Sequence, residues 1–473
     1  MSRSAARRAW PAALLPLALA ALLVGAALRL AELGAWSFWA DEVASLNISA
    51  ASMADIWRRA QDLNAPLYYL FLHGWQGLAA GEAWQRLPSA LAGVLALPLV
   101  WRIGASLGDE VAGVLAMGLL AVSPLHVWYS REVRMYVLAC FFAVAAFYCY
   151  VCLLRGGGVR HAAGFAVATL LAVYTAYAAL LFWAALLVVF PVLARRQGTG
   201  AAQVRAFWIA QLAVALGFAG YLTVFGAQIA SGNLGFLGKR LAGFMPQLGP
   251  ALAGLTGAVL VAGLCVWKTH RAKGTLRASA WAPWIVILAF LALTLLAAVP
   301  RGFSVKRQLL VFWPFVVLAA AWALRRINLP GLYAGALVAS LAATAALLAA
   351  GPAEDWRGAA AYIATVAQPG DTIYAQSDLA GAALAYYYRG PVPIYAPGLD
   401  GVWTAPPPAP ERGATAWVVA NDHPALQDEV AALSARLGIW GRPEIRAAFA
   451  RFLRVIAYRT EASKSRNGAL PLI

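Results

Sequence analysis

The chain has 473 residues, of which 62% are hydrophobic and only 12% are charged. A water-soluble protein of this length carries about twice that charged fraction, so the composition excludes an ordinary soluble enzyme. The formal net charge is +17. The basic residues lie in short loops between apolar runs, which argues against a nucleic-acid-binding protein. Several of these runs reach the ~20 residues that cross a bilayer as a helix. The sequence therefore predicts a polytopic α-helical membrane protein.

Apolar segments follow one another from the N-terminus to residue 350. The first is long for the core of a secretory signal peptide and lacks a convincing cleavage site of small residues. We interpret it as an uncleaved helix, the first of about 11 transmembrane helices. The segments are expected near 10–31, 64–80, 87–106, 111–128, 134–154, 161–176, 178–195, 206–227, 248–267, 281–299, 308–324 and 331–350.

The basic loops give the orientation, because cytoplasmic loops are enriched in lysine and arginine. Arginines before the first segment place the N-terminus in the cytoplasm, and residue 155 begins another cytoplasmic loop. An even number of crossings must separate the two, so one of the segments between them does not cross. The best candidate is 64–80, the shortest, which we predict to be an interfacial or re-entrant helix in an outer loop over 32–86. The alternative is that one of the segments between 87 and 154 fails to cross.

The C-terminal tail, residues 352–473, differs in composition from the rest of the chain. Its sequence pattern predicts a small α/β domain. Short runs at 372–375 and 416–420 are typical of strands, and Asp378 to Arg389 is typical of a helix. About eleven crossings from an inside start place this domain outside the cell. We therefore predict two domains, a transmembrane domain over 1–351 that includes the outer loop, and an extracytoplasmic domain over 352–473.

Two adjacent carboxylates, Asp41 and Glu42, follow an aromatic cluster where the chain leaves the first apolar segment. Ionisable groups beside a membrane are costly unless they are solvated, paired or used in function. The pair is therefore a candidate general base or metal ligand. The alternative is a solvated loop pair, or a cap for a helix that begins near Val43.

Two clusters of cations are expected on the same outer face. Arg131 and Arg134 fall on one side of a helix, and guanidinium groups bind phosphate in a bidentate way. Interfacial anchoring is the alternative. Arg301, Lys306 and Arg307 precede a later span and break the positive-inside bias, which indicates a site for a lipid phosphate or pyrophosphate. Their alternative is ordinary snorkelling to the interface.

Further residues complete the predicted substrate site. Glu132 is placed to orient the neighbouring arginines, and Tyr136 ends the same stretch. Tyr68 and His73 lie in the segment that is not expected to cross. An isolated histidine is more often a structural hydrogen-bonding residue than a ligand.

Several short stretches, taken in order, carry a family resemblance. They are 38–46 (FWADEVASL), 64–70 (NAPLYYL), 86–93 (RLPSALAG), 123–124 (SP), 129–136 (YSREVRMY) and 174–177 (YTAY). Together they resemble the bacterial glycosyltransferase family 39 group. That group belongs to the wider GT-C fold of dolichyl-phosphate-mannose protein mannosyltransferases and lipid A aminoarabinose transferases. The later spans match this group mainly in layout.

The resemblance implies a bacterial inner-membrane enzyme that takes a sugar from a polyprenyl phosphate in the outer leaflet. The acceptor would be an extracytoplasmic lipid, glycan or protein. In a single inverting displacement, a carboxylate deprotonates the acceptor and cations stabilise the departing phosphate. By motif, Asp41 would be the base, with Glu42 supporting it or binding a divalent cation if one is used. Arg131 and Arg134 would position donor or acceptor, and Arg307 would meet the lipid phosphate.

Two positions depart from the family pattern. Ala65 and Ala176 stand where family members often have histidine, and each departure removes a polar group from the expected cavity. Altered substrate choice and weak activity are both consistent with this. Two other functions remain open. One is an oligosaccharide ligase or polymerase with the same fold; the other is a transporter or flippase, which more often shows paired halves and charged groups at mid-membrane.

Overall fold

The computed structural model describes most of the chain. The described residues are 14–58, 65–223, 307, 309–327, 330–397, 414–421, 444–449 and 453–459. They form two compact units. The first comprises residues up to Leu33, Ala51–Ala80 and Trp84–Ala349, and the second comprises Gly34–Ala50, Gly81–Ala83 and Ala350–Ile473.

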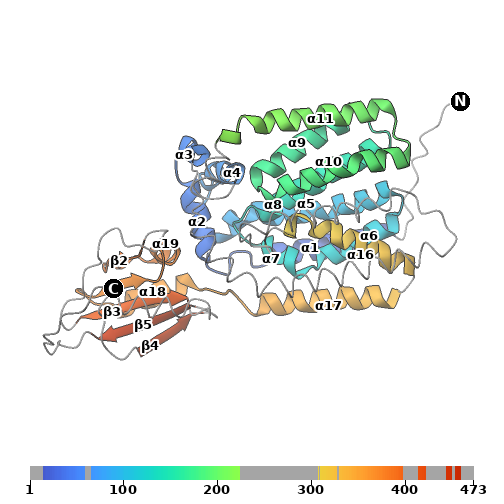
Figure 1. Cartoon of the computed structure of the whole chain (residues 1–473). Coiled ribbons are helices and arrows are strands. Elements are labelled where there is room, and N and C mark those ends of the chain that lie inside the picture. Colours follow the sequence, from blue (N-terminus) through green and yellow to red (C-terminus); the bar gives the residue numbers. More distant parts are fainter. Residues whose placement is uncertain are drawn as a thin grey trace, which may run out of the picture. The chain divides into compact units, whose positions relative to one another are not determined.

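The first unit is a bundle of helices (Figure 1). Five of its described helices are long and apolar enough to cross a membrane. They are α5 (Glu82–Leu107), α8 (Tyr136–Leu154), α10 (Ala178–Gln197), α11 (Ala201–Ala219) and α17 (Pro330–Ala349). The shorter helices are α1 (Leu14–Leu30), α3 (Met53–Arg58), α4 (Leu67–Gln76), α6 (Glu110–Ala121), α7 (Pro124–Tyr129), α9 (Val159–Thr175), η2 (Leu309–Val311) and α16 (Trp313–Ile327).

The helical membrane-protein class is thus supported, whereas the expected number of about 11 spans is not confirmed. The predicted segments at 248–267 and 281–299 lie outside the described residues. The predicted segment 111–128 is broken into α6 and α7. The physical reason is Pro124, which has no backbone N–H to donate and cannot continue the preceding helix.

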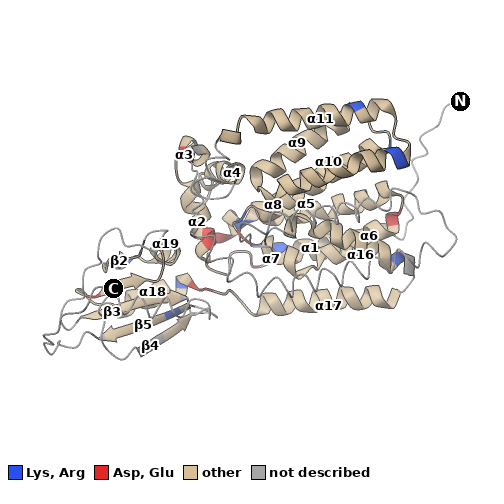
Figure 2. Ribbon diagram, viewed as in Figure 1, with Lys and Arg blue, Asp and Glu red and all other residues tan. Residues whose placement is uncertain are grey.

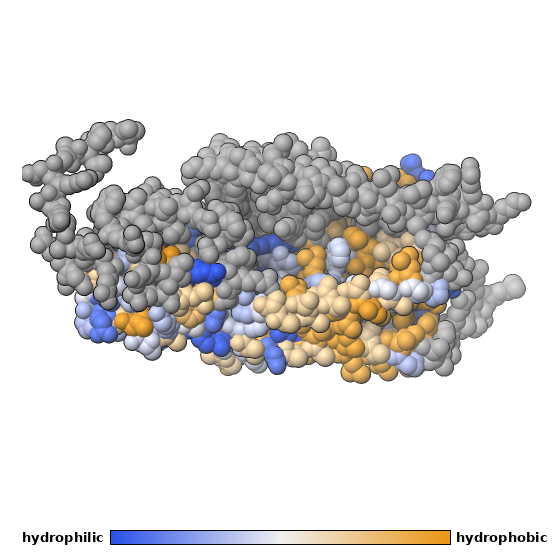
Figure 3. Space-filling view, turned by 90° about the horizontal axis from the view of Figure 1, so that it is seen from below, coloured by the Kyte–Doolittle hydropathy of each residue, from blue (hydrophilic) through white to orange (hydrophobic). Residues whose placement is uncertain are grey.

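Aromatic rings from distant helices build the core of the bundle. Phe315 of α16 packs against Phe147 of α8 and Phe182 of α10, with ring centroids 4.8 and 5.4 Å apart. Large apolar side chains also face outward, such as Ile209, which is 68% exposed, and Val338, which is 65% exposed. Hydrophobic residues gather on the described part of the bundle on the face seen in Figure 3. A surface of this kind suits contact with lipid.

Helix α4 occupies the segment that was predicted not to cross. Its ten residues rise by about 15 Å, roughly half the thickness of the hydrocarbon layer. Trp75 near its end stacks on Trp84 at the start of α5, with centroids 4.4 Å apart. The helix is therefore too short to span a bilayer by itself, and its interfacial or re-entrant position stays a prediction.

The second unit holds a mixed sheet with strand order β2-β1-β3-β5-β4. Strand β1 (Thr372–Ala375) pairs in parallel with β2 (Ile394–Tyr395) and β3 (Thr415–Asn421). Strand β5 (Leu453–Arg459) runs antiparallel to both β3 and β4 (Glu444–Phe449). Helix α18 (Trp356–Val366) packs against β4 and β5, and α19 (Asp378–Tyr387) packs against β1 (Figure 1). The predicted strands and the helix after Asp378 are confirmed.

One segment is grouped differently from the sequence expectation. Residues 34–50 were expected in an outer loop of the transmembrane domain, but they belong to the second unit. They contain α2 (Ala40–Ser49), which packs against α19. The cause is burial of aromatic surface, because Phe38 is fully buried and its ring meets Tyr386 edge to face, with centroids 5.6 Å apart.

Candidate functional site

The two carboxylates lie in the first turn of α2 and differ in environment. The Trp39 backbone N–H donates to Glu42 Oε2 at 3.2 Å, and Glu42 is fully buried. A carboxylate in the first turn of a helix accepts free N–H groups and favours the helix dipole. Glu42 therefore caps α2, which begins at Ala40 and not near Val43 as the capping alternative expected. Asp41 is half-buried, and its backbone carbonyl accepts a hydrogen bond from Ser45.

The described residues do not fit a metal site made by both carboxylates. Neighbouring residues on a helix do not face each other, so Asp41 and Glu42 point in different directions. Glu42 Oε2 is also engaged by the Trp39 N–H. In the part of the chain that the structure describes, no group of three or more histidine, cysteine or acidic side chains is gathered as a metal site would require. We derive no chemical step through a metal ion.

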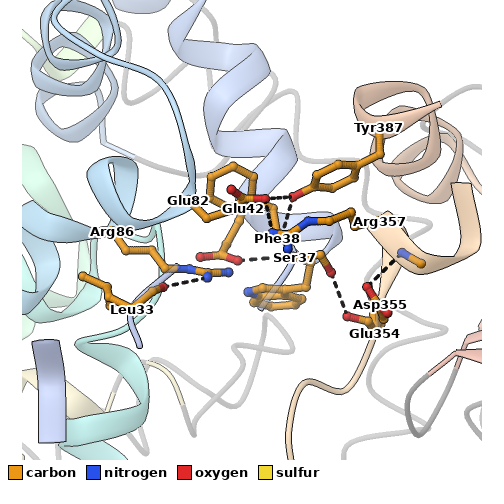
Figure 4. Close-up of polar contacts among 12 residues, drawn as sticks. Leu33, Ser37, Phe38, Glu42, Glu82, Arg86, Glu354, Asp355, Arg357 and Tyr387 are labelled. Atoms are coloured by element: carbon orange, nitrogen blue, oxygen red, sulfur yellow. Dashed lines mark hydrogen bonds and ion pairs between the residues drawn. The ribbon is translucent and has the colours of Figure 1, made fainter. Parts of the chain in front are cut away.

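The backbone just before the acid pair is held by residues from the tail (Figure 4). The Phe38 N–H donates to the Tyr387 hydroxyl at 2.7 Å. The Ala40 N–H donates to Glu354 Oε2 at 3.2 Å, and the Ser37 hydroxyl donates to the Glu354 carbonyl at 3.4 Å. All of these groups belong to the second unit.

A second layer of contacts supports the tail residues in turn. Tyr387 donates its hydroxyl proton to Glu82 Oε1 at 3.0 Å, and Glu82 forms an ion pair with Arg357. Burial raises the pKa of Tyr387 above its usual range, which keeps the phenol protonated. The Trp356 indole N–H donates to Glu354 Oε2 at 2.6 Å. The acid pair thus follows a short segment whose backbone groups are bound on several sides.

Arg131 and Arg134 were predicted on one side of a helix, but both lie in the turn between α7 and α8. Arg131, predicted to hold substrate, binds the end of α1 instead. Its Nη1 donates to the carbonyls of Ala31 at 2.7 Å and Leu28 at 3.1 Å, and its Nη2 donates to the Glu32 carbonyl at 3.1 Å. The last carbonyls of a helix lack partners within it and carry partial negative charge. Arg131 therefore caps α1, and we leave it out of the proposed phosphate-binding set.

A cluster of polar side chains forms around Arg134 and Arg307. We define the cation cluster as Tyr129, Glu132, Arg134, Tyr136 and Arg307. Arg134 Nη2 donates to the Tyr136 hydroxyl at 3.2 Å, and the guanidinium lies 5.5 Å from the centre of that ring. Arg307 donates to the Tyr129 hydroxyl. Burial, reinforced by the charge of Glu132, raises the pKa of Tyr129 to about 12.

The cation cluster brings together residues that are far apart in the sequence. Arg134 and Glu132 are each 7% exposed, and the rings of Tyr129 and Tyr136 meet edge to face at 5.6 Å. Charged side chains are otherwise sparse along the helices of the bundle (Figure 2). Cations held in a largely buried polar cluster are suited to an anionic group.

The other predicted site residues have varied positions. Tyr68 is buried on α4 with its ring 5.7 Å from that of Tyr69, and His73 is half-buried on the same helix. Arg301 and Lys306 lie outside the described residues. The acid pair belongs to the second unit, and the cation cluster belongs to the first.

Residues that the sequence reasoning missed or set aside contribute buried polar contacts. Arg29 is fully buried at the end of α1, and its Nη2 lies 2.9 Å from His126 Nδ1. It also donates to the carbonyls of Gly25 and Ala121. A charged residue inside an apolar segment is the signal that marks it. Nothing in the sequence pattern points to Glu354 or Tyr387.

Comparison with known proteins gives a likeness at the level of fold. No protein-family model matches the sequence, and no curated protein is significantly similar to it. The family 39 assignment is therefore not confirmed. Among solved structures, the Archaeoglobus fulgidus oligosaccharyltransferase in its apo form aligns with a TM-score of 0.55 at 12% identity. The alignment covers 86% of this chain and 69% of the archaeal one.

Other matches are weaker in structural agreement. ArnT from Cupriavidus metallidurans in the apo state has a TM-score of 0.45 at 14% identity, over 94% of this chain and 97% of the other. The Saccharomyces cerevisiae protein O-mannosyltransferase Pmt1-Pmt2 complex has a TM-score of 0.37 at 19% identity, over 45% of this chain. The chain spans only 33% of the yeast chain's length. The archaeal comparison shows that this protein has a GT-C-like fold.

Proposed function

We propose that the protein is a membrane glycosyltransferase that transfers a sugar from a polyprenyl phosphate to an extracytoplasmic acceptor. The observation that carries the proposal is the cation cluster, in which Arg307 donates to Tyr129 and Arg134 donates to the neighbouring Tyr136. Paired guanidinium groups bind phosphate oxygens strongly in a site of low water content. The GT-C-like fold supports the same reading.

The proposed reaction is a single displacement with inversion at the anomeric carbon. Asp41 takes the proton of the acceptor hydroxyl, and the acceptor oxygen forms a bond to the anomeric carbon as the bond to the phosphate oxygen breaks. The electron pair leaves with the polyprenyl phosphate. Arg134 and Arg307 stabilise the charge that develops on this leaving group. Glu42 has no chemical role in this scheme, because its carboxylate caps α2.

The proposal keeps the predicted arrangement in the membrane. The helical unit lies in the membrane, and the extracytoplasmic domain comprises residues 352–473 together with residues 34–50, which fold with them. The lipid-linked donor approaches from the outer leaflet of the inner membrane. A second candidate is an oligosaccharide ligase, because the archaeal neighbour with the same fold is named an oligosaccharyltransferase. The two candidates differ in the size of the group that is transferred.

The test measures transfer by the full-length protein in membranes of a heterologous host. Undecaprenyl-phosphate-linked mannose, glucose, arabinose and aminoarabinose serve as radiolabelled donors, with an undecaprenyl-diphosphate-linked oligosaccharide for the second candidate. Label is followed into lipid, glycan and protein fractions. We expect Asp41→Asn to reduce the rate at least about a hundredfold, because a positioned general base contributes this much.

The matched control is Asp55→Asn, which changes an exposed aspartate of α3 whose carboxylate accepts a hydrogen bond from Ser52. This variant should transfer at the wild-type rate. Failure of every monosaccharide donor would refute the proposed function, and transfer from the oligosaccharide donor alone would establish the second candidate instead. Full activity in Asp41→Asn would refute the role of Asp41 as the base.

A further inference from the structure

The tail binds backbone N–H groups of two of the three residues before Asp41, namely Phe38 and Ala40. Backbone N–H groups at the start of a helix have no partners within it. The N–H of Ala40, the first residue of α2, is bound by Glu354, and the N–H of Phe38, two residues before the helix, is bound by Tyr387. Both acceptors come from residues more than three hundred positions later in the chain.

The two contacts are partly buried and are supported by a second set of partners. Phe38 is fully buried, and Glu354 is 8% exposed. Glu354 Oε2 also accepts the Trp356 indole N–H. The Tyr387 ring is bounded by the Arg357 guanidinium, which lies 5.9 Å from its centre. Loss of one acceptor would remove this contact from a partly buried backbone donor, and the local backbone would move to replace it.

We infer that Glu354 and Tyr387 are positioning residues that set the direction of the Asp41 side chain, an inference that rests on the proposed function. The backbone of residues 38–40 leads directly into Asp41, so a change in its path turns the carboxylate. Displacement of a reacting group by about 1 Å can reduce a rate a hundredfold. The tail is therefore part of the catalytic apparatus rather than an independent appendage.

The main variant is Tyr387→Phe, which removes the hydroxyl and keeps the ring. The matched control is Tyr388→Phe in the same unit, where the hydroxyl accepts from the Val392 N–H. At Glu354, alanine removes the acceptor, whereas glutamine retains an oxygen for the Ala40 N–H. We expect Tyr387→Phe and Glu354→Ala to lower kcat about tenfold to a hundredfold with little change in KM. Glu354→Gln should recover most of kcat.

Hydrogen–deuterium exchange of the purified full-length protein gives a readout that needs no activity. Peptides that contain Phe38 and Ala40 should exchange at least about tenfold faster in Tyr387→Phe and Glu354→Ala, and at the wild-type rate in Tyr388→Phe. Unchanged exchange, or faster exchange without any fall in kcat, would overturn the inference. If the wild-type protein transfers no sugar, the proposed function and the catalytic consequence fail together. The exchange measurement would still show separately whether the tail holds this segment.

Discussion

Replacing Arg131 by alanine separates a structural role from a role in binding substrate. The guanidinium donates to the carbonyls of Leu28, Ala31 and Glu32 at distances between 2.7 and 3.1 Å, and the residue is 8% exposed. A hydrogen bond to a charged group contributes about 1.5–3 kcal/mol. These bonds share one side chain, so their energies do not simply add. We expect the free energy of unfolding to fall by about 3–5 kcal/mol.

Thermal unfolding of the purified protein in detergent, followed by tryptophan fluorescence, checks this expectation. Arg131→Lys keeps the charge but loses the planar guanidinium group. Its unfolding temperature should lie between those of the wild-type protein and Arg131→Ala. Arg102→Ala changes an exposed arginine of α5 and should alter stability by less than about 0.5 kcal/mol. The reasoning is refuted if Arg131→Ala unfolds at the wild-type temperature but no longer binds undecaprenyl phosphate.

Two other predictions concern stability. Since burial raises the pKa of Tyr387, the unfolded chain loses this proton near pH 10 while the folded chain keeps it, so stability should fall as the pH rises above about 10. Tyr387→Phe should make the fall shallower in denaturation measured across pH 8–12; an identical slope would contradict the assignment. Gly104→Ala would press a methyl group on the Gly113 backbone and should cost about 1–3 kcal/mol. The control is Gly335→Ala, because a methyl group at this position of α17 would meet open space. Its effect on thermal stability should be neutral or slightly stabilising. Equal stability of the two variants would contradict the close packing of Gly104 against Gly113.

Local patterns in the sequence were sufficient to predict the class of protein and much of the secondary structure of the tail. Apolar runs of bilayer length predicted the long helices, because each such run must satisfy its own backbone hydrogen bonds in lipid. Short runs of strand-forming residues bounded by turn residues predicted β1 and β3, and the stretch from Asp378 predicted α19. The break at Pro124 was also readable, since proline removes a backbone donor and favours the first turn of a new helix, although α5 continues through Pro88 and Pro98. The interpretation of 111–128 as one segment gave too much weight to hydropathy.

The candidate site shows what sequence could and could not supply. Asp41, Glu42, Arg134 and Arg307 were marked by their chemical type at the ends of apolar segments. Their partners were not, because a contact such as that of Tyr387 with Phe38 depends on distant parts of the chain meeting. Arg131 shows that residue type alone can also suggest a wrong role. Its residue type indicated phosphate binding, but its position made it the cap of α1.

The sequence by itself thus determined that this is a helical membrane protein with an acid pair after its first apolar segment and a small α/β tail. Only the tertiary structure decided that residues 34–50 fold with the tail, that Glu42 caps α2, and that Arg307 lies beside Tyr129. The physical reason is that helix formation and lipid burial follow from local composition. Hydrogen-bond partners and buried charges depend on which distant segments pack together.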